Sequence, residues 1–373
     1  MFADEFPLDA DLCYLNHAAV APWPTRTTRA VQAFAEENNH TGSRHYERWL
    51  ATEGDLREGL RQLINAASTD EIALLKNTSE ALSVVAHGLD WHADDEVVIS
   101  HLEFPSNRIV WESLARYGVK VRIADLYRRE NPEQALLDCL TERTRLLSVS
   151  SVQYGNGLRL DLPVLGKACR ERNILFCVDA IQSIGTGPFD VQAMQADFVM
   201  ADGHKWMLGP EGLALFYCRR ERLETLRLNQ YGWHMVAAVG EFDRKDWAPS
   251  PTATRFECGS PNLLCAHALH ASIGLLLEVG METVAERILA RTQRIIDFIQ
   301  DAPERYSLIT DPTPARRAGI VTFKPLREDL DVLYRRLQAA GVICAQRGGG
   351  IRFSPHFHTR PDEIERALSL LGA

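Results

Sequence analysis

Several features that define common protein classes are missing from this sequence. Its 373 residues contain no apolar run that approaches the length of a membrane-spanning helix. The first residues, MFADEFPLDADL, carry acids where a secretory signal would carry bases. The formal net charge of −9 argues against nucleic acid or an anionic membrane as a partner. We therefore expect a cytoplasmic protein that binds neither of them.

The cysteines and glycines also lack the spacings that mark metal and nucleotide sites. The eight cysteines are scattered without a CxxC pair, and several stand inside apolar, strand-like runs. This pattern predicts small buried side chains in a reducing compartment and no metal site. No GxGxxG or GxxxxGK(S/T) turn follows a predicted strand, which counts against a nucleotide-dependent α/β protein.

A chain of this length has room for a large α/β domain and a smaller second one. Three short apolar runs near its middle are typical of strands in a sheet that is covered on both faces: Ile174–Val178, Asp197–Ala201 and Leu213–Tyr217. Polar residues follow the first two runs. Because ligands bind at the carboxyl edge of open α/β sheets, these polar residues are candidates for a site.

Asp179 and Lys205 stand just after two of these predicted strands. An aspartate and a lysine in this arrangement suit pyridoxal phosphate (PLP), which needs an amine for its aldehyde and a carboxylate for its ring nitrogen. The apolar residues Trp206–Leu208 favour the neutral amine that forms a Schiff base. Taken singly, the two residues would more simply be a turn cap and a surface lysine, so only the pair points to PLP.

The surrounding motifs strengthen this interpretation. The segments VDAIQ (178–182) and GHKWMLGPEGLALFY (203–217) together resemble the core of the class V aminotransferase family. That family consists of fold type I PLP enzymes and includes cysteine desulfurases and isopenicillin N epimerase-like proteins. The segment RFECGSPN (255–262) is similar to a family signature as well, and the resemblance covers nearly the whole chain.

The resemblance implies a fold, a cofactor and an assembly. The fold would be α/β, with a mainly parallel seven-stranded sheet in a PLP-binding large domain (1–262) and a smaller α+β carboxyl-terminal domain (263–373). Residues 1–24 would pack near the small domain. The cofactor would be pyridoxal 5'-phosphate, and the assembly a homodimer whose active sites are shared across the interface.

By the same resemblance, the central block supplies most of the cofactor contacts. Lys205 would carry the Schiff base, and Asp179 would pair with the pyridine nitrogen. Gln182 would hydrogen-bond to the phenolate oxygen, and His204 would reach the phosphate. Phe104 would stack on the ring, although by itself it would more simply be a core residue.

The phosphate is expected at a helix start. Thr78 and Ser79 follow a predicted strand and open a helix, where free N–H groups, the helix dipole and hydroxyls favour an anion. The resemblance assigns Ser260 to the phosphate in the neighbouring subunit. Asp202 stands where desulfurases place a serine. A carboxylate beside a phosphate is unfavourable unless it is protonated or turned away, so the role of Asp202 stays open.

Substrate contacts are expected from both ends of the chain. The resemblance places Asn16 and His17 in a pocket-lining segment, and Arg352 where an arginine holds the substrate α-carboxylate. Alone, His17 and Arg352 would more simply be solvated. Five residues are expected to set the choice of substrate side chain: His17, His45, Tyr46, Trp233 and His234.

The reaction is less closely defined than the cofactor. Tyr154 replaces the asparagine of desulfurases, and Cys344 stands early in a strand-like segment instead of on a loop that could carry their sulfur-accepting cysteine. We expect a transaminase first, on the prevalence of that activity in the family. A lyase that cleaves the C–S bond of a cysteine-like substrate comes second, and an epimerase third. A nucleotide-dependent or binding protein without PLP is the alternative from a different class.

Overall fold

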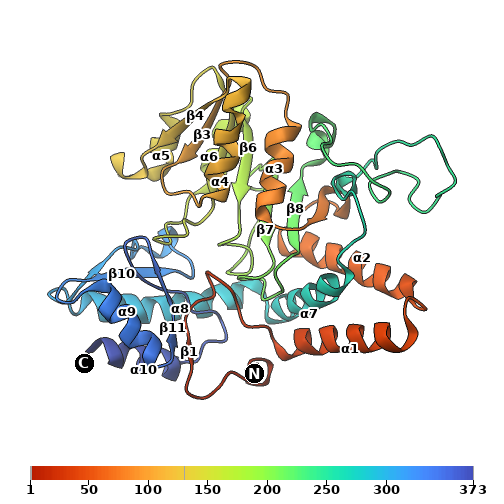
Figure 1. The fold of residues 1–373 in the computed structure, drawn as a ribbon. Helices are drawn as coiled ribbons and strands as arrows, with labels where there is room; N and C mark the ends of the chain where they lie inside the picture. The colour runs from red at the N-terminus through yellow and green to blue at the C-terminus, as the bar shows by residue number, and fades with distance from the viewer. Residues whose placement is uncertain (1, 130, 373) are drawn as a thin grey trace.

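A seven-stranded sheet forms the centre of the larger part of the molecule (Figure 1). The computed structural model describes residues 2–129 and 131–372. In the sheet that these residues form, the order is β2-β8-β7-β6-β5-β3-β4, and β8 alone runs antiparallel to its neighbours. The strands are β2 (Ile72–Leu75), β3 (Glu96–Ser100), β4 (Lys120–Ala124), β5 (Thr144–Ser150), β6 (Leu175–Asp179), β7 (Phe198–Asp202) and β8 (Ala214–Cys218). The predicted mainly parallel seven-stranded sheet is confirmed.

The three apolar runs of the central block form β6, β7 and β8, each beginning one residue later than predicted. Their side chains alternate between two cores, as the pleat requires. Val178 and Val199 face one core, whereas Cys177 and Phe198 face the other. Both faces are therefore covered, which explains why these strands are apolar throughout.

Helices cover the two faces of the sheet. On one face, α3 (Thr78–Gly88) and α4 (Ser106–Glu112) contribute to the core. On the other, the core includes residues of α2 (Tyr46–Leu63), α6 (Leu162–Glu171) and α7 (Leu263–Val279). The remaining helices here are α1 (Thr25–Thr41), which packs on α7, and the short α5 (Pro132–Leu137).

The carboxyl-terminal part is built around a second, antiparallel sheet of order β12-β13-β10-β9. Its strands are β9 (Tyr306–Leu308), β10 (Val321–Pro325), β12 (Ala345–Arg347) and β13 (Gly350–Phe353). Its helices are α8 (Met281–Gln300), α9 (Leu330–Ala339) and α10 (Pro361–Gly372). A separate apolar core joins these helices to the sheet. The division of the chain into domains at residue 262 stays a prediction, because α7 packs on α1 and α2.

The amino-terminal segment runs along the carboxyl-terminal part. Here β1 (Cys13–Tyr14) pairs in parallel with β11 (Val342–Ile343), and Asn16 forms an isolated bridge with Ser354. Short 3-10 turns complete the described chain: Ala3–Glu5, Thr69–Glu71, Ser113–Tyr117, Leu126–Arg128, Arg220–Thr225, Ala253–Phe256 and Pro314–Arg316. The basic segment at residues 219–227 forms only the 3-10 turn Arg220–Thr225.

The segments around α7 and α8 have two further features. Between β8 and α7, the chain extends away from the body of the molecule as a long loop (Figure 1). Among the described residues, no single helix is long and apolar enough to cross a membrane. Helices α7 and α8 meet the length and composition criteria only as a pair, and that pair is bent by 83°. The bend falls at Gly280, whose φ of +82° suits a residue without a Cβ.

Candidate active site

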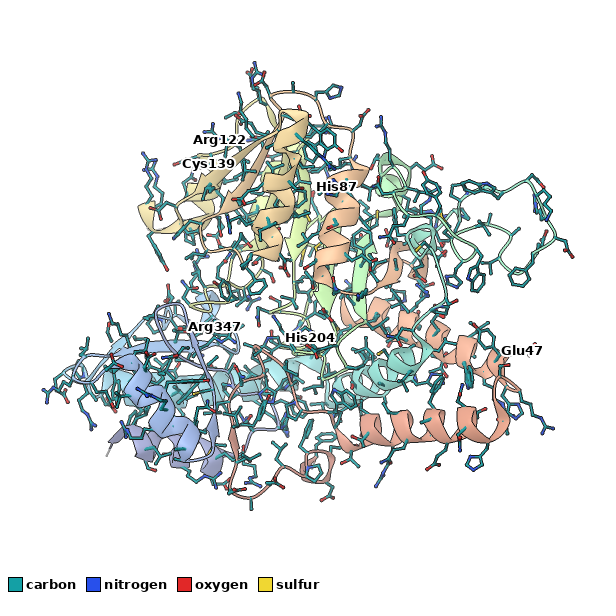
Figure 2. All side chains as sticks on the ribbon, in the orientation of Figure 1. Glu47, His87, Arg122, Cys139, His204 and Arg347 are labelled. Atoms are coloured by element: carbon teal, nitrogen blue, oxygen red, sulfur yellow. The ribbon has the colours of Figure 1, made fainter. Side chains whose placement is uncertain are left out.

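The carboxyl ends of β6 and β7 bring the predicted catalytic residues together. Asp179 is the last residue of β6 and is 2% exposed. Lys205 lies three residues beyond the end of β7, in a compact turn where the Gly209 N–H donates to the Gly203 carbonyl at 2.9 Å. The turn lies at the base of the sheet, next to the carboxyl-terminal part, as the position of His204 shows (Figure 2).

Burial brings the pKa values of the two residues close to neutrality. It raises the pKa of Asp179 to about 7, and the negative charge of Glu103 adds to the effect. Burial lowers the pKa of Lys205 to about 8, and the positive charge of Arg352 adds to this decrease. Each of the pair partly offsets the shift of the other, because Asp179 favours the ammonium and Lys205 favours the carboxylate. A lysine with such a pKa can supply a neutral amine near pH 7.

Glu103 is a buried carboxylate that the sequence analysis did not single out. Its oxygens accept hydrogen bonds from five donor groups: the Ser100 hydroxyl at 2.8 Å, the Asn107 amide at 2.8 Å, the Ser150 N–H at 3.0 Å, the Ser150 hydroxyl at 2.5 Å and the Gln153 amide at 3.1 Å. Glu103 immediately precedes Phe104, in the polar turn after β3. This position, next to a predicted cofactor residue, is the sequence signal that could have identified Glu103.

Phe104 lies beside Lys205, as a stacking residue should. The Lys205 Nζ atom is 5.8 Å from the centroid of the Phe104 ring, and the Phe104 side chain is 41% exposed. Tyr154 packs edge-on against the same ring, with centroids 5.1 Å apart. An aromatic ring held at its edge and exposed on the site side can stack on a planar ligand.

The start of α3 offers unsatisfied polar groups. The Thr78 hydroxyl is buried and has no hydrogen-bond partner among the described residues. Ser79 is exposed, and its hydroxyl donates to that of Ser106 at 2.8 Å. Asn77 caps the helix through its side chain, which accepts from the Glu80 N–H. The arrangement is a helix start with a free hydroxyl, which suits an anion.

Asp202 and His204 form a pair beyond β7. Asp202 Oδ1 and His204 Nδ1 lie 3.1 Å apart, although neither atom has a well-aligned hydrogen bond within the described chain. The carboxylate of Asp202 therefore faces the histidine. A carboxylate this close to an imidazole can orient that ring. A role of the two residues at the phosphate stays a prediction.

Arg352 is a buried cation without a carboxylate partner in the described chain. It is 2% exposed, and its Nη1 donates to the Tyr154 carbonyl at 2.8 Å. Its Nε has no partner among the described residues. Burial lowers the pKa of Arg352 to about 10, and the charge of Arg347 adds to this shift. An arginine in this state can bind an incoming carboxylate, because that ion would restore its charge balance.

His17 is wholly buried, so the solvated histidine of the simpler interpretation is wrong. Its Nδ1 donates to the Ser354 carbonyl at 2.9 Å, and its Nε2 lies 3.1 Å from His358 Nε2. Burial lowers the pKa of His17 to about 4, so the ring is neutral and both nitrogens are used. In this conformation His17 has no hydrogen bond to offer a substrate. Its neighbour Asn16 has a buried Oδ1 without a partner among the described residues.

Gln182 is held between the central block and the amino-terminal segment. Its Oε1 accepts from Trp206 Nε1 at 2.7 Å, and its Nε2 donates to the Ala18 carbonyl at 3.0 Å. One amide N–H is left for a ligand. The contact to a cofactor oxygen that the sequence predicted is therefore still available.

The other residues expected to choose the substrate lie in separate surroundings. Tyr46 opens α2 next to His45, and its ring packs on Trp49 with centroids 5.7 Å apart. Trp233 is partly exposed on the long loop between β8 and α7. His234 follows it and lies 3.8 Å from Glu257. A role for these residues in substrate choice stays a prediction.

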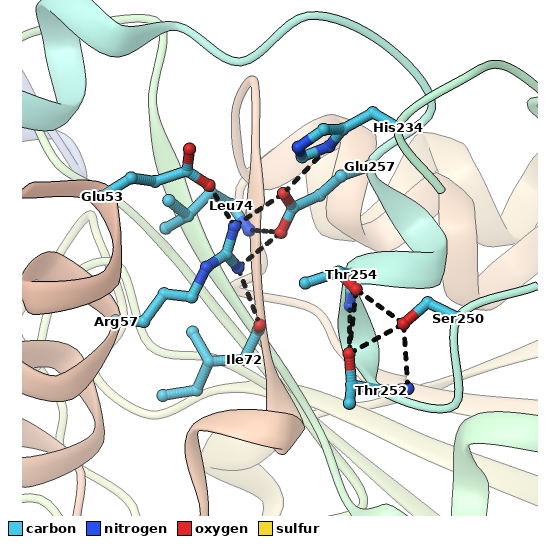
Figure 3. Close-up of polar contacts among 9 residues, drawn as sticks. All are labelled: Glu53, Arg57, Ile72, Leu74, His234, Ser250, Thr252, Thr254 and Glu257. Atoms are coloured by element: carbon cyan, nitrogen blue, oxygen red, sulfur yellow. Dashed lines mark hydrogen bonds and ion pairs between the residues drawn. The ribbon is translucent and has the colours of Figure 1, made fainter. Parts of the chain in front are cut away.

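His234 belongs to an ionic cluster that lies between α2 and the segment before α7 (Figure 3). Glu53, Glu257 and His234 are close enough to share a metal ion. However, the Arg57 guanidinium lies between the two carboxylates, with Nη1 2.6 Å from Glu257 Oε1. Arg57 already supplies the positive charge, so the cluster holds α2 to the 253–257 turn.

Ser260 is exposed and lines a cavity of about 390 Å³ together with Lys76, Glu80 and Cys258. The cavity adjoins the segment that leads from β2 into α3. A role of Ser260 in the site of a second subunit stays a prediction.

These features, a mainly parallel sheet with a lysine, an aspartate and an anion-binding helix start at its carboxyl edge, define a PLP enzyme of fold type I. The chain belongs to the class-V aminotransferase family, whose profile matches residues 13–366. Pyridoxal phosphate is the cofactor of this family and of this enzyme.

Curated relatives cover most of the chain. A probable cysteine desulfurase of Methanothermobacter thermautotrophicus is 30% identical over 97% of this chain and 94% of its own length. A probable cysteine desulfurase of Streptomyces coelicolor is 33% identical over 83% of this chain and 75% of its own length. An uncharacterized aminotransferase, YcbU, of Bacillus subtilis is 28% identical over 93% of this chain and 90% of its own length.

Solved structures agree with the fold. The apo cysteine desulfurase of Thermococcus onnurineus superposes with a TM-score of 0.88, at 22% identity, over 99% of this chain and 96% of that one. A mutant of C-DES with glycine covalently linked to its PLP cofactor gives a TM-score of 0.91, at 22% identity, over 98% of both chains. The predicted fold type I architecture is confirmed.

The residues at the site fit PLP. The cofactor has a phosphate, a ring nitrogen and an aldehyde, and the described chain offers an unsatisfied group for each. Thr78 has a buried hydroxyl without a hydrogen-bond partner in the described chain, which suits a phosphate. Asp179 is a buried carboxyl group whose pKa is raised by burial, and a ring N–H would compensate for its lost solvation. Lys205 supplies the amine.

Proposed function

We propose that this protein is a PLP-dependent C–S lyase that acts on cysteine or a closely related amino acid. The observation that carries the choice of bond is the name shared by the relatives at 30% and 33% identity, both probable cysteine desulfurases. The sequence alone led us to expect transamination first. The relatives favour our second expectation, a lyase that cleaves a C–S bond.

The chain's own residues divide the work on the substrate. When bound, PLP supplies an aldehyde for an amine and a protonated ring that accepts electron density from the substrate Cα. Arg352 would bind the α-carboxylate in its buried, unbalanced position. Lys205, with a pKa of about 8, would take the proton from Cα. Asp179 would hold the proton on the ring nitrogen.

Loss of the Cα proton allows the bond between Cβ and sulfur to break. The sulfur leaves as sulfide, and the three-carbon fragment leaves as aminoacrylate, which water converts to pyruvate and ammonia. Cys344 is buried, and burial raises its pKa to about 12. A thiol in that state is a poor nucleophile, so we propose that sulfur is released and is not passed to Cys344.

The proposal includes a homodimer in which Ser260 faces the phosphate of the neighbouring subunit's cofactor. It is supported by the exposure of Ser260 in a cavity beside the start of α3. S260A should then weaken PLP binding without a change in the monomer fold. Sedimentation of the holoenzyme tests the assembly, and a monomer at working concentration would contradict this part.

The test of function is a product analysis on the PLP-loaded enzyme. Cysteine is added without any keto acid, and sulfide, pyruvate, ammonia and alanine are measured. The proposal predicts equal amounts of sulfide, pyruvate and ammonia, and no activity in K205A. Alanine together with a protein-bound persulfide would show a desulfurase in place of a lyase.

Transamination is the second candidate, because the Bacillus subtilis relative is named as an aminotransferase. It predicts that an amino acid converts the cofactor to its amine form while the matching keto acid appears once. Added keto acid would then restore the original visible band. This outcome, with no sulfide from cysteine, would replace the lyase by a transaminase.

A further inference from the structure

The loop at residues 153–157, which follows β5, is fastened to the small sheet by its backbone. Three consecutive carbonyls of the loop each accept a hydrogen bond from a side chain of the carboxyl-terminal part: Tyr154 from Arg352 Nη1 at 2.8 Å, Gly155 from Thr322 Oγ1 at 2.8 Å and Asn156 from Thr310 Oγ1 at 2.7 Å. All three donors are buried. Such a run of side-chain donors fixes three of the five loop residues.

The donors are themselves fixed by the small sheet. Thr322 and Arg352 are directly opposite each other in the register of β10 and β13. The Thr310 hydroxyl accepts from the Thr322 N–H at 2.8 Å, so its own proton is directed to the loop. The side chain of Arg352 thus shares a rigid frame with the two threonines.

The other side of the loop contacts the cofactor-binding part. The Gln153 amide donates to Glu103 at 3.1 Å, and the Tyr154 ring packs on Phe104. The turn between β12 and β13, next to Arg347 in Figure 2, packs tightly against this loop. A Cβ on Gly348 would lie 2.3 Å from the Gly155 carbonyl oxygen. The loop therefore connects the Phe104 wall to Arg352 at one fixed distance.

We propose that the 153–157 loop is the positioning element for the substrate carboxylate, with Thr310 and Thr322 as positioning residues that act through it on Arg352. The inference rests on the proposed role of Arg352 in binding an amino-acid carboxylate. The bond from Nη1 to the Tyr154 carbonyl sets the plane of the guanidinium, whose donors form a rigid fork. If the loop becomes mobile, the plane of the Arg352 guanidinium is no longer fixed.

The test replaces the threonine hydroxyls by methyl groups of nearly the same shape. T322V and T310V leave Arg352 intact but remove the donors to the loop. Binding of glycine and of methylamine is followed through the visible band of the PLP-loaded enzyme. We expect the affinity for glycine to fall about fivefold to tenfold, which corresponds to the loss of one buried hydrogen bond. Methylamine has no carboxylate, and its affinity should stay unchanged.

Two further variants separate positioning from stability. T292V removes another fully buried hydroxyl, on α8, where it bonds within the helix and to Arg317. It should lower the melting temperature without changing either affinity. T322S keeps the hydroxyl and should restore glycine binding. With cysteine as substrate, T322V should raise KM and leave kcat within about twofold.

Unchanged glycine affinity in both T322V and T310V would overturn the inference. An equal loss for glycine and methylamine would overturn it as well, because it would show general damage to the site. Failure of the proposed C–S lyase is visible separately, as a wild-type enzyme that binds glycine but releases no sulfide from cysteine. The positioning role would survive that result, since every α-amino acid carries the carboxylate.

Discussion

The low pKa of Lys205 can be tested through the pH dependence of cofactor capture. Only a neutral amine attacks the aldehyde of PLP. With a pKa of about 8, roughly a tenth of Lys205 is neutral at pH 7. With the ordinary value of 10.5, about 300-fold less would be neutral at that pH. The rate at which the apoprotein captures PLP should therefore rise with pH and level off above about pH 8.

The substitution R352Q tests the cause of the shift. Arg352 lowers the pKa of Lys205 by its positive charge, so removing that charge must raise the pKa. The midpoint of the capture profile should move to higher pH. Each unit of movement reduces the neutral amine at pH 7 about tenfold. The same variant should raise KM for an amino acid about tenfold to a hundredfold through loss of a charge-assisted bond.

The assay is rapid mixing of apoprotein with PLP between pH 6 and pH 10, followed by visible absorbance. K205A is the blank, since it has no amine to react. R347Q is the matched control, because Arg347 is the last residue of β12 in the same hairpin but is exposed. A wild-type midpoint near pH 10.5 would refute the reasoning. A midpoint that does not move in R352Q would refute the assigned cause.

Three other predictions test separate parts of the structure. D179N should retain the fold but lose at least about 100-fold in kcat, because an amide cannot hold the ring nitrogen protonated; kinetics after saturation with PLP check this. G185A should lower the free energy of unfolding by about 3 kcal/mol or more, as measured by urea unfolding. Its Cβ would lie 2.1 Å from the Trp206 carbonyl oxygen at a φ of +99°. Acidification should destabilise the fold through His17, whose pKa of about 4 in the folded state lies below the unfolded value of 6.5. The contribution of neutral His17 to the free energy of unfolding is therefore complete above pH 6.5 and is lost as the pH falls toward 4. Wild type should lose about 3 kcal/mol of unfolding free energy more than H17Q, and equal acid sensitivity in both would contradict it. Burial lowers the pKa of His356 and of His358 too, so H17Q keeps their acid sensitivity.

The sequence was most informative where chemistry and local pattern coincide. The strands of the central block were predicted within one residue, because continuous apolar runs mark strands that are buried on both faces. Asp179 and Lys205 lie close enough to shift each other's pKa, because β6 and β7 end at one edge of the sheet.

The features of the site that the sequence did not reveal depend on contacts between segments that are far apart in the chain. No local pattern tells that His17 is buried against Ser354, 337 positions away. Glu103 has local partners in Ser100 and Asn107, but its hydrogen bonds from Ser150 and Gln153 come from residues 47 and 50 positions away, which reach it only when β3 and β5 pair. The pairing of Asp202 with His204 could have been suggested by their spacing, but its geometry depends on the turn after β7.

The position of β1 has a consequence for synthesis on the ribosome. The segment at residues 13–21 is made early, yet its N–H and carbonyl groups bond to Ile343, Ser354 and His204. Its strand partner at 342–343 is translated only after the whole large sheet has emerged. A nascent chain stalled at residue 340 would therefore hold Asp179 and Lys205 on a formed sheet, but neither the strand pairing of β1 nor Arg352. The active site is therefore complete only when the last tenth of the chain has been made and has paired with the amino-terminal segment.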